Sequence, residues 1–147
     1  MSKAMRSLVG MVLCVTMVLS MGGWTGSAAV VPEEIVSPCF NYTSGTNTNM
    51  IISGGSADCY ARAIGYTGIT TKIHIKMSLQ EYLALQWLTV GEWEGTFNGV
   101  SGTLNKFKTL TSSGNYRVKA VYTVYSGSAS EEITSYSPEK YFTYTSP

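Results

Sequence analysis

The stretch that decides the fold of this 147-residue chain is SGNYRVKAVYTVY, residues 113–125. Every second residue from Tyr116 to Val124 is apolar or aromatic, with more polar residues between them. This period of two is typical of a half-buried β-strand. The same period runs through residues 71–79, TKIHIKMSL. We therefore expect two strands here, each with one face toward a core.

Weaker alternation continues over the rest of the chain, in residues 56–66, 86–96, 99–110 and 134–144. Both faces of 86–96 are mixed, so its inner face stays open. Residues 78–88 have some helical spacing, but a strand followed by a loop is the preferred interpretation. Glycine-containing turns separate the segments, and Asn98-Gly99 is the strongest signal for a tight hairpin. The pattern predicts an all-β sandwich of about seven antiparallel strands.

The start of the chain has the composition of a signal peptide. Lys3 and Arg6 precede an almost wholly apolar run over residues 7–21. That run is shorter than the roughly 20 residues that a membrane-spanning helix needs. We therefore predict a helical, cleavable signal peptide and a secreted, extracellular protein, free or attached to the cell surface. An uncleaved membrane anchor is the alternative.

Small residues mark the expected cleavage site. Ser27 and Ala29 fit the pattern that signal peptidase recognises, so we place the cleavage after Ala29. Cleavage after Ala28 fits nearly as well. Removal of this segment leaves residues 30–147 as the mature chain.

Three parts are expected: a signal peptide at 1–29, an N-terminal strand with a flexible polar loop at 30–50, and the sandwich domain at 51–147. Residues 41–50, NYTSGTNTNM, are too polar to bury and are the expected loop. The chain holds 10 Lys and Arg and 9 Asp and Glu, and two of the basic residues lie in the signal segment, so the mature net charge is 8 − 9 = −1. This excludes the basic stripe of most nucleic-acid-binding proteins. Contact with a membrane is expected only through the signal peptide.

Two cysteines, Cys39 and Cys59, remain after cleavage. In an oxidising compartment they have one intramolecular pairing. Closing the loop of about 20 residues between them would contribute about 3 kcal/mol in the chain-entropy model. Two free, buried thiols are the alternative.

The sequence Gly114-x-Tyr116-x-Val118 resembles the tyrosine corner of immunoglobulin-like and fibronectin-III-like sandwiches. In those domains the tyrosine hydroxyl bonds back to the chain upstream, so the large ring is buried without an unpaired polar group. The resemblance implies this structural role for Tyr116 and an immunoglobulin-like form of the predicted sandwich. Val118 stands where the second core cysteine would be, which leaves Cys39 as the only candidate partner of Cys59.

A further resemblance covers roughly residues 57–142. Its strings are, in order, MSLQ from Met77, WLTV from Trp87 with Trp93, GNYRVKA from Gly114, SEE from Ser130 and YS from Tyr136. They are similar to a family of small secreted proteins from Gram-positive, largely clostridial, bacteria. The family has no established activity, so the resemblance implies a compartment and a fold and no catalytic or binding residues.

The residues that usually carry chemistry are scarce. His74 is the only histidine, and strand alternation places it on the solvent face, away from Asp58, the only aspartate. A catalytic triad needs a nucleophile, a base and an acid within reach of one another. Zinc needs more ligands than one histidine and two distant cysteines. We therefore predict no catalytic, cofactor or metal site.

One carboxylate pair deserves a test. Glu92 and Glu94 would lie on one strand face about 6.8 Å apart, a separation compatible with glycoside hydrolysis. Charges on a solvent face that protect a sheet edge are commoner. A small glycoside hydrolase is thus the least favoured hypothesis.

The aromatic residues suggest a binding role. Trp87 and Trp93 lie six residues apart, and exposed rings on a flat sheet can stack on sugars. Packing between the sheets is the favoured interpretation for each ring. We expect a non-enzymatic module that binds an extracellular protein or a cell-wall component. The alternative is a carbohydrate-binding or cell-wall-binding module with the two tryptophans as its ligand platform.

Overall fold

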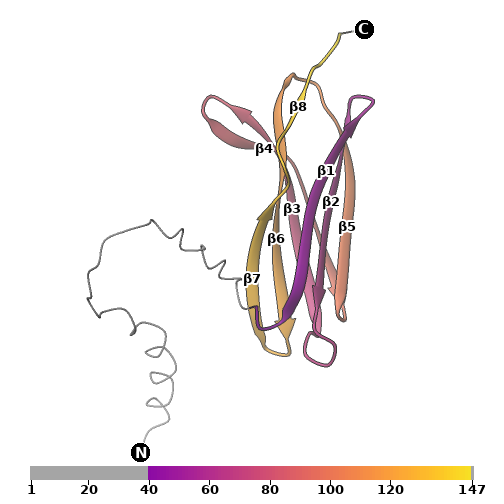
Figure 1. Ribbon diagram of the computed structural model, residues 1–147, viewed down its shortest axis with the longest axis vertical. Helices are drawn as coiled ribbons and strands as arrows, with labels where there is room; N and C mark the ends of the chain where they lie inside the picture. The colour runs from indigo at the N-terminus through magenta and orange to yellow at the C-terminus, as the bar shows by residue number, and fades with distance from the viewer. Residues whose placement is uncertain (1–39, 147) are drawn as a thin grey trace, which may run out of the picture. The chain divides into compact units, whose positions relative to one another are not determined.

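The computed structural model describes residues 40–146, which form two antiparallel β-sheets packed face to face (Figure 1). The expected all-β, immunoglobulin-like sandwich is confirmed, with one strand more than predicted. Its eight strands are β1 (Thr43–Ser53), β2 (Ser56–Gly65), β3 (Lys72–Leu83), β4 (Gln86–Asn98), β5 (Ser101–Thr109), β6 (Gly114–Ser126), β7 (Ala129–Tyr136) and β8 (Lys140–Phe142).

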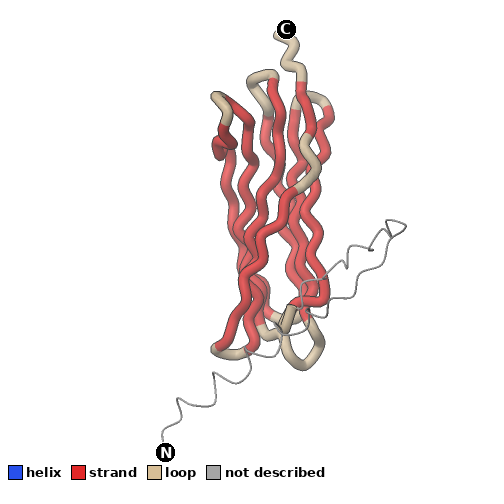
Figure 2. The backbone as a smooth tube through the Cα atoms, turned by 60° about the vertical axis from the view of Figure 1, so that its left-hand side comes forward, coloured by secondary structure: helices blue, strands red, loops and turns tan. Residues whose placement is uncertain are grey.

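The smaller sheet has the strand order β1-β2-β5, and the larger has the order β4-β3-β6-β7. The short β8 pairs with the start of β6, so β7 and β8 share one edge of that strand. Figure 2 shows the two layers of strands along the length of the domain. The tight hairpin predicted at Asn98-Gly99 is wrong, because these residues lead from β4 in one sheet to β5 in the other. Gly99 does adopt a positive φ of 102°, but the local signal does not distinguish a hairpin from a crossing between sheets.

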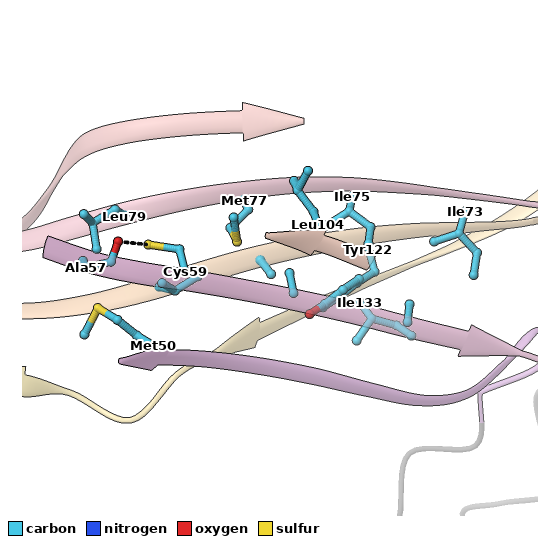
Figure 3. Packing of buried hydrophobic residues seen from close by; sticks show 14 of the residues in the cluster. Met50, Ala57, Cys59, Ile73, Ile75, Met77, Leu79, Leu104, Tyr122 and Ile133 are labelled. Atoms are coloured by element: carbon cyan, nitrogen blue, oxygen red, sulfur yellow. Dashed lines mark hydrogen bonds between the residues drawn. The ribbon is translucent and has the colours of Figure 1, made fainter. Parts of the chain in front are cut away.

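Alternation along three strands builds the core. Most inward side chains of β3 and β6 are large, whereas three of the four side chains that β2 directs inward are alanines, so small and large side chains face each other across the core. Figure 3 shows several of these side chains meeting between the sheets. The buried apolar side chains of these three strands are Ala57, Cys59, Ala61, Ala63, Ile73, Ile75, Met77, Leu79, Tyr116, Val118, Ala120, Tyr122 and Val124.

The flexible polar loop predicted at residues 41–50 is wrong, because most of it belongs to β1 and pairs with β2 from Thr43 to Ser53. The strand is polar because its outer face is solvated and its inner face uses threonine. Thr48 and Met50 are both buried, and the Thr48 hydroxyl finds a partner in the core. Backbone pairing and this bond compensate for the small apolar surface of β1. The sandwich therefore begins before residue 51.

Tyr122 joins the two sheets through its hydroxyl. The ring is fully buried on β6, and its hydroxyl donates to the Asn47 carbonyl oxygen on β1 at 2.9 Å. The Thr48 hydroxyl lies 2.7 Å from the Tyr122 hydroxyl oxygen. A buried hydroxyl without partners would cost about 1–3 kcal/mol, and β1 supplies two partners. Burial also raises the pKa of Tyr122 above its ordinary value, so the phenol stays protonated and able to donate.

Tyr116 lies at the start of β6 and is 2% exposed. Its hydroxyl donates to the carbonyl oxygen of Ser112, four residues upstream, at 2.9 Å. This is the bond that a tyrosine corner requires. The Ser112 hydroxyl in turn donates to the buried carboxylate of Glu81 at 2.6 Å. The corner therefore also satisfies a carboxylate that β3 carries into the interior.

We expect Tyr122→Phe to lower the free energy of unfolding by about 1–2 kcal/mol, because Asn47 and Thr48 lose their partner inside the core. Urea denaturation at neutral pH measures the change. Tyr141→Phe is the matched control, since the Tyr141 ring is 67% exposed and its loss of a hydroxyl should change stability by less than about 0.5 kcal/mol. Equal effects of the two substitutions would show that the inter-sheet bond is not stabilising.

Glu131 on β7 holds the entry to β1. Its carboxylate accepts hydrogen bonds from the backbone N–H of Asn41 at 2.8 Å, the N–H of Tyr42 at 2.9 Å and the Thr43 hydroxyl at 2.7 Å. Partial burial acts to raise the pKa of Glu131, but these three hydrogen bonds outweigh it and hold the pKa below its ordinary value of 4.5. The ionised form is therefore the one that the fold stabilises.

The lowered pKa of Glu131 sets the sign of a pH dependence. Its contribution is fully present above pH 4.5, the unfolded value, and is lost as the pH falls through the lower folded value. Glu131→Gln should lower stability at pH 7 and reduce the loss of stability between pH 5 and pH 3. Thermal unfolding over this range measures both effects. Glu132→Gln, an exposed neighbour, is the control, and an identical pH profile for the two variants would contradict the assignment.

Candidate functional site

The tip of the β3–β4 hairpin projects away from the other strands (Figure 1). Leu79 pairs with Gly91 but Gln80 pairs with Thr89, so Val90 is an extra residue in β4. A bulge of this kind bends its strand and increases the local twist. The pairing of β3 with β6 also ends at Glu81, so the last residues of the hairpin have no neighbouring strand on that side.

The turn at this tip has an unusual backbone. Ala84 and Leu85 both have positive φ values, 49° and 65°, as a two-residue type I′ turn requires. Asparagine and glycine are the usual residues there, because other side chains cost about 1–2 kcal/mol each in this conformation. Leu85 is also 89% exposed. The hairpin thus keeps an exposed apolar residue in a strained position, a combination that occurs at functional sites.

Arg117 lies between two aromatic rings on the outer face of the larger sheet. Its guanidinium carbon is 4.1 Å from the centre of the Trp87 ring and 4.4 Å from that of Tyr136. Its Nε donates to the Gln80 side-chain oxygen at 3.0 Å. Tyr82, opposite Trp87 in register, packs on the tryptophan with ring centres 5.1 Å apart. The guanidinium is thus held by three side chains, Trp87, Tyr136 and Gln80, from three strands.

Part of the Arg117 guanidinium remains available. Within residues 40–146 its two terminal nitrogens make no hydrogen bond, and no carboxylate pairs with it. Each stacked ring contributes about 0.5–2 kcal/mol by cation–π attraction, which holds the group without using these donors. A planar guanidinium held in this way can bind a carboxylate through two parallel hydrogen bonds.

Exposed apolar side chains surround this arginine. We call Tyr82, Leu85, Trp87, Arg117 and Tyr136 the hairpin patch. Tyr141 of β8, 67% exposed, pairs with Asn115 on the same outer face, whereas the exposed Leu83 and Leu88 lie on the opposite face of the hairpin. Exposed apolar surface of this kind is often found at interaction sites.

The two predicted platform tryptophans do not lie on one face, so the predicted ligand platform of Trp87 and Trp93 is wrong. Trp93 pairs with the buried Met77 and packs against the core, whereas Trp87 lies on the outer face. Their spacing of six would place both on the same side of a regular strand. The extra residue, Val90, reverses the alternation between them.

Glu92 and Glu94 lie on the outer face of β4, on the solvent side of the sheet. Glu92 pairs with Lys76 at 3.3 Å, and Glu94 lies 3.7 Å from His74. The two carboxylate side chains are 52% and 69% exposed. They do not form the enclosed pair that glycoside hydrolysis requires. His74 also contacts the Thr96 hydroxyl at 2.9 Å, which makes this region a charged, solvated surface.

Cys59 is fully buried on the inner face of β2 and forms no disulfide within residues 40–146. Burial, aided by the charge of Asp58, raises the pKa of its thiol to about 12, so the thiolate that reacts is scarce at neutral pH. Cys39 lies outside the described residues, and so do the predicted signal peptide and the cleavage site predicted after Ala29. The Cys39–Cys59 pairing therefore stays a prediction.

The described part of the chain holds no group of three or more His, Cys, Asp or Glu that could bind a metal ion. It also holds no helix of sufficient length and hydrophobicity to cross a bilayer.

The hairpin patch could be predicted only in part. Alternation places Arg117 on the outer face of its strand, and Trp87 was a candidate from its residue type alone. Tyr82 and Tyr136 join them through strand pairings that no local pattern specifies.

No family model matches the chain, and no curated protein sequence is similar to it. Three solved structures are similar at low identity. CsgH of R. palustris is 16% identical over 60% of this chain and 87% of its own, with a TM-score of 0.39. A protein from Archaeoglobus fulgidus is 12% identical over 71% of this chain and 99% of its own, with a TM-score of 0.38.

The third similar structure is catalytically inactive OgpA from Akkermansia muciniphila in complex with an O-glycopeptide substrate. It is 11% identical over 69% of this chain and 30% of its own, with a TM-score of 0.38. At these scores the three similarities carry no information about what this chain binds.

We expect the double substitution Ala84→Asn with Leu85→Gly to raise the free energy of unfolding by about 1 kcal/mol, because it places the usual residues of a type I′ turn at positive φ. Urea denaturation measures the gain. Ile69→Gly is the control, since Ile69 is exposed in a loop without a positive φ, and glycine there should lower stability. A loss of stability in the double variant would show that the turn is not strained.

Proposed function

We propose that this chain is a secreted, non-enzymatic interaction module that binds an extracellular protein through the hairpin patch. The observation that carries this proposal is the stacking of Arg117 between Trp87 and Tyr136 beside an exposed apolar hairpin tip. Tryptophan, tyrosine and arginine supply most of the binding energy at protein interfaces. The signal segment at residues 1–29 supports the extracellular part of the proposal.

The packing of the Trp87 ring favours a protein over a sugar as the partner at this patch. A sugar stacks on an open ring face, but Arg117 covers the Trp87 ring at 4.1 Å and Tyr82 packs on it from another strand. A protein partner uses what remains exposed. Its surface would offer a carboxylate to the terminal nitrogens of Arg117 and an apolar pocket to Leu85.

The rigidity of the patch supports a binding role in a second way. Arg117 is already held by Gln80 and two rings, so little side-chain entropy is lost when it contacts a partner. The paired strands β3, β4 and β6 carry these groups, and a site built on strands keeps its geometry better than one built on loops.

The test compares variants of the mature chain, residues 30–147, for retention of cell-envelope proteins of the source organism. Arg117→Ala and Leu85→Asn should each weaken binding of the retained partner by about tenfold or more. Lys72→Ala is the matched control, because Lys72 also lies over a ring, that of Tyr125, at 4.1 Å, but at the start of β3, far from the hairpin tip.

The proposal is supported if Lys72→Ala still binds the partner and both Arg117→Ala and Leu85→Asn lose this binding. Circular dichroism and thermal unfolding check that each variant is folded. The proposal is wrong if the native chain retains no partner, or if Arg117→Ala and Leu85→Asn bind the partner as tightly as the native chain does.

A further inference from the structure

A second polar surface lies on the opposite side of the sandwich, on the outer face of the smaller sheet. Because Cys59 and Ala61 of β2 point into the core, Asp58, Tyr60 and Arg62 point outward. These three residues follow one another along the central strand of that sheet.

The neighbouring strands place amides and hydroxyls beside this row. Asn49 of β1 and Asn105 of β5 flank Tyr60 in register. Asn47 and Thr103 flank Arg62 in the same way. The outer face thus presents a tyrosine ring surrounded by planar polar side chains.

A groove runs between β1 and β2 along this face. It consists of a depression of about 350 Å³ beside Asp58 and a second of about 220 Å³ beside Arg62, and both are lined by Asn47 and Tyr60. We call this pair of depressions the β1–β2 groove. Asp58 and Arg62 lie four residues apart on one strand, so the groove is about 13 Å long.

Several polar groups of the groove lack partners within residues 40–146. The Asp58 Oδ1 atom is buried and makes no hydrogen bond, and neither Asp58 nor Arg62 forms a salt bridge. Asn49 is held in one orientation, because its side-chain oxygen accepts a hydrogen bond from the Met50 N–H at 2.8 Å. Its NH₂ group is left as a donor. A buried acceptor without a partner is rare in folded proteins.

We propose that the β1–β2 groove binds a short oligosaccharide. Sugar hydroxyls both donate and accept, so one ligand can donate to Asp58 and accept from Asn49 and Arg62. The ring of Tyr60 supplies the apolar surface on which a sugar face packs, between the two charged ends. This site is independent of the hairpin patch, since the two lie on different sheets.

A peptide is less suited to this position. Peptides that bind to sheets usually pair with a free edge through backbone hydrogen bonds. The groove instead lies on a face whose backbone groups are already paired, in both β1–β2 and β2–β5. The groove therefore offers side chains alone, which is the way that proteins recognise sugar hydroxyls.

The experiment is an NMR titration of the ¹⁵N-labelled mature chain with linear trisaccharides of N-acetylglucosamine, glucose and galactose, one at a time at millimolar concentration. We expect at least one of them to shift the amide signals of Asn49, Asp58, Tyr60 and Arg62 while those of Trp87 and Arg117 stay unchanged. Tyr60→Ala should then lower the affinity about tenfold, and Tyr60→Phe, which keeps the ring, should lower it less.

Phe107→Ala is the matched control. Phe107 is an aromatic residue on the same face and is 68% exposed; it pairs with Asp58 in register, but it lies on β5 and lines neither depression of the groove. The Phe107→Ala substitution should leave the affinity for the trisaccharide within about twofold of the native value. The proposal is overturned if none of the three trisaccharides shifts the groove signals, if the shifts occur at the hairpin patch, or if Phe107→Ala weakens binding as much as Tyr60→Ala.

The proposal is also overturned if a strand-forming peptide binds instead and shifts the amide signals of β1 alone. That result would indicate that the peptide adds as a strand to the free edge of the sheet. The titration follows the two faces through separate amide signals. If no trisaccharide binds at the β1–β2 groove, the proposed protein binding at the hairpin patch is therefore unaffected. Loss of partner binding in Arg117→Ala likewise has no bearing on the groove.

Discussion

The hydroxyl of Tyr122 reaches through the core to β1, and much of the domain depends on this contact. β1 is an edge strand with few apolar side chains, so burial alone would hold it weakly. The hydrogen bonds to Asn47 and Thr48 fix its position over the larger sheet. That position in turn places Asn49 beside Tyr60 on the outer face. A buried bond between sheets thereby determines the shape of a surface on the far side of a strand.

Patterns in the sequence predict the strands whose inner faces are apolar. The alternation at Ile73 to Leu79 and at Tyr116 to Val124 is enough to identify β3, β6 and their inward sides, because burial of one face imposes a period of two. β1 could not be predicted from the sequence, because its inner face is not mainly apolar. Its inward residues include Thr48, whose burial depends on a partner 74 residues away, and no local pattern can signal such a contact.

The proposed binding surfaces are harder to predict from the sequence than the fold. One extra residue, Val90, moves Trp87 and Trp93 to opposite faces, and a bulge has no signature in a segment whose two faces are both mixed. The stack around Arg117 joins side chains from four strands, so it exists only once the register of the whole larger sheet is set. Residue types suggested that aromatic rings matter, and only the pairing of strands showed which rings come together.

The hydrogen bonds from the backbone of Asn41 and Tyr42 to Glu131 also fix the end of the domain at which the chain enters the sandwich. The chain enters the sandwich at that end, whereas β3 runs for 12 residues, about 40 Å, to the hairpin tip at the other end. Any tether that joins the domain before residue 40 would therefore hold Leu85 at the far pole, facing outward. The length of β3 thus separates the exposed Leu85 from the end at which the chain enters the sandwich.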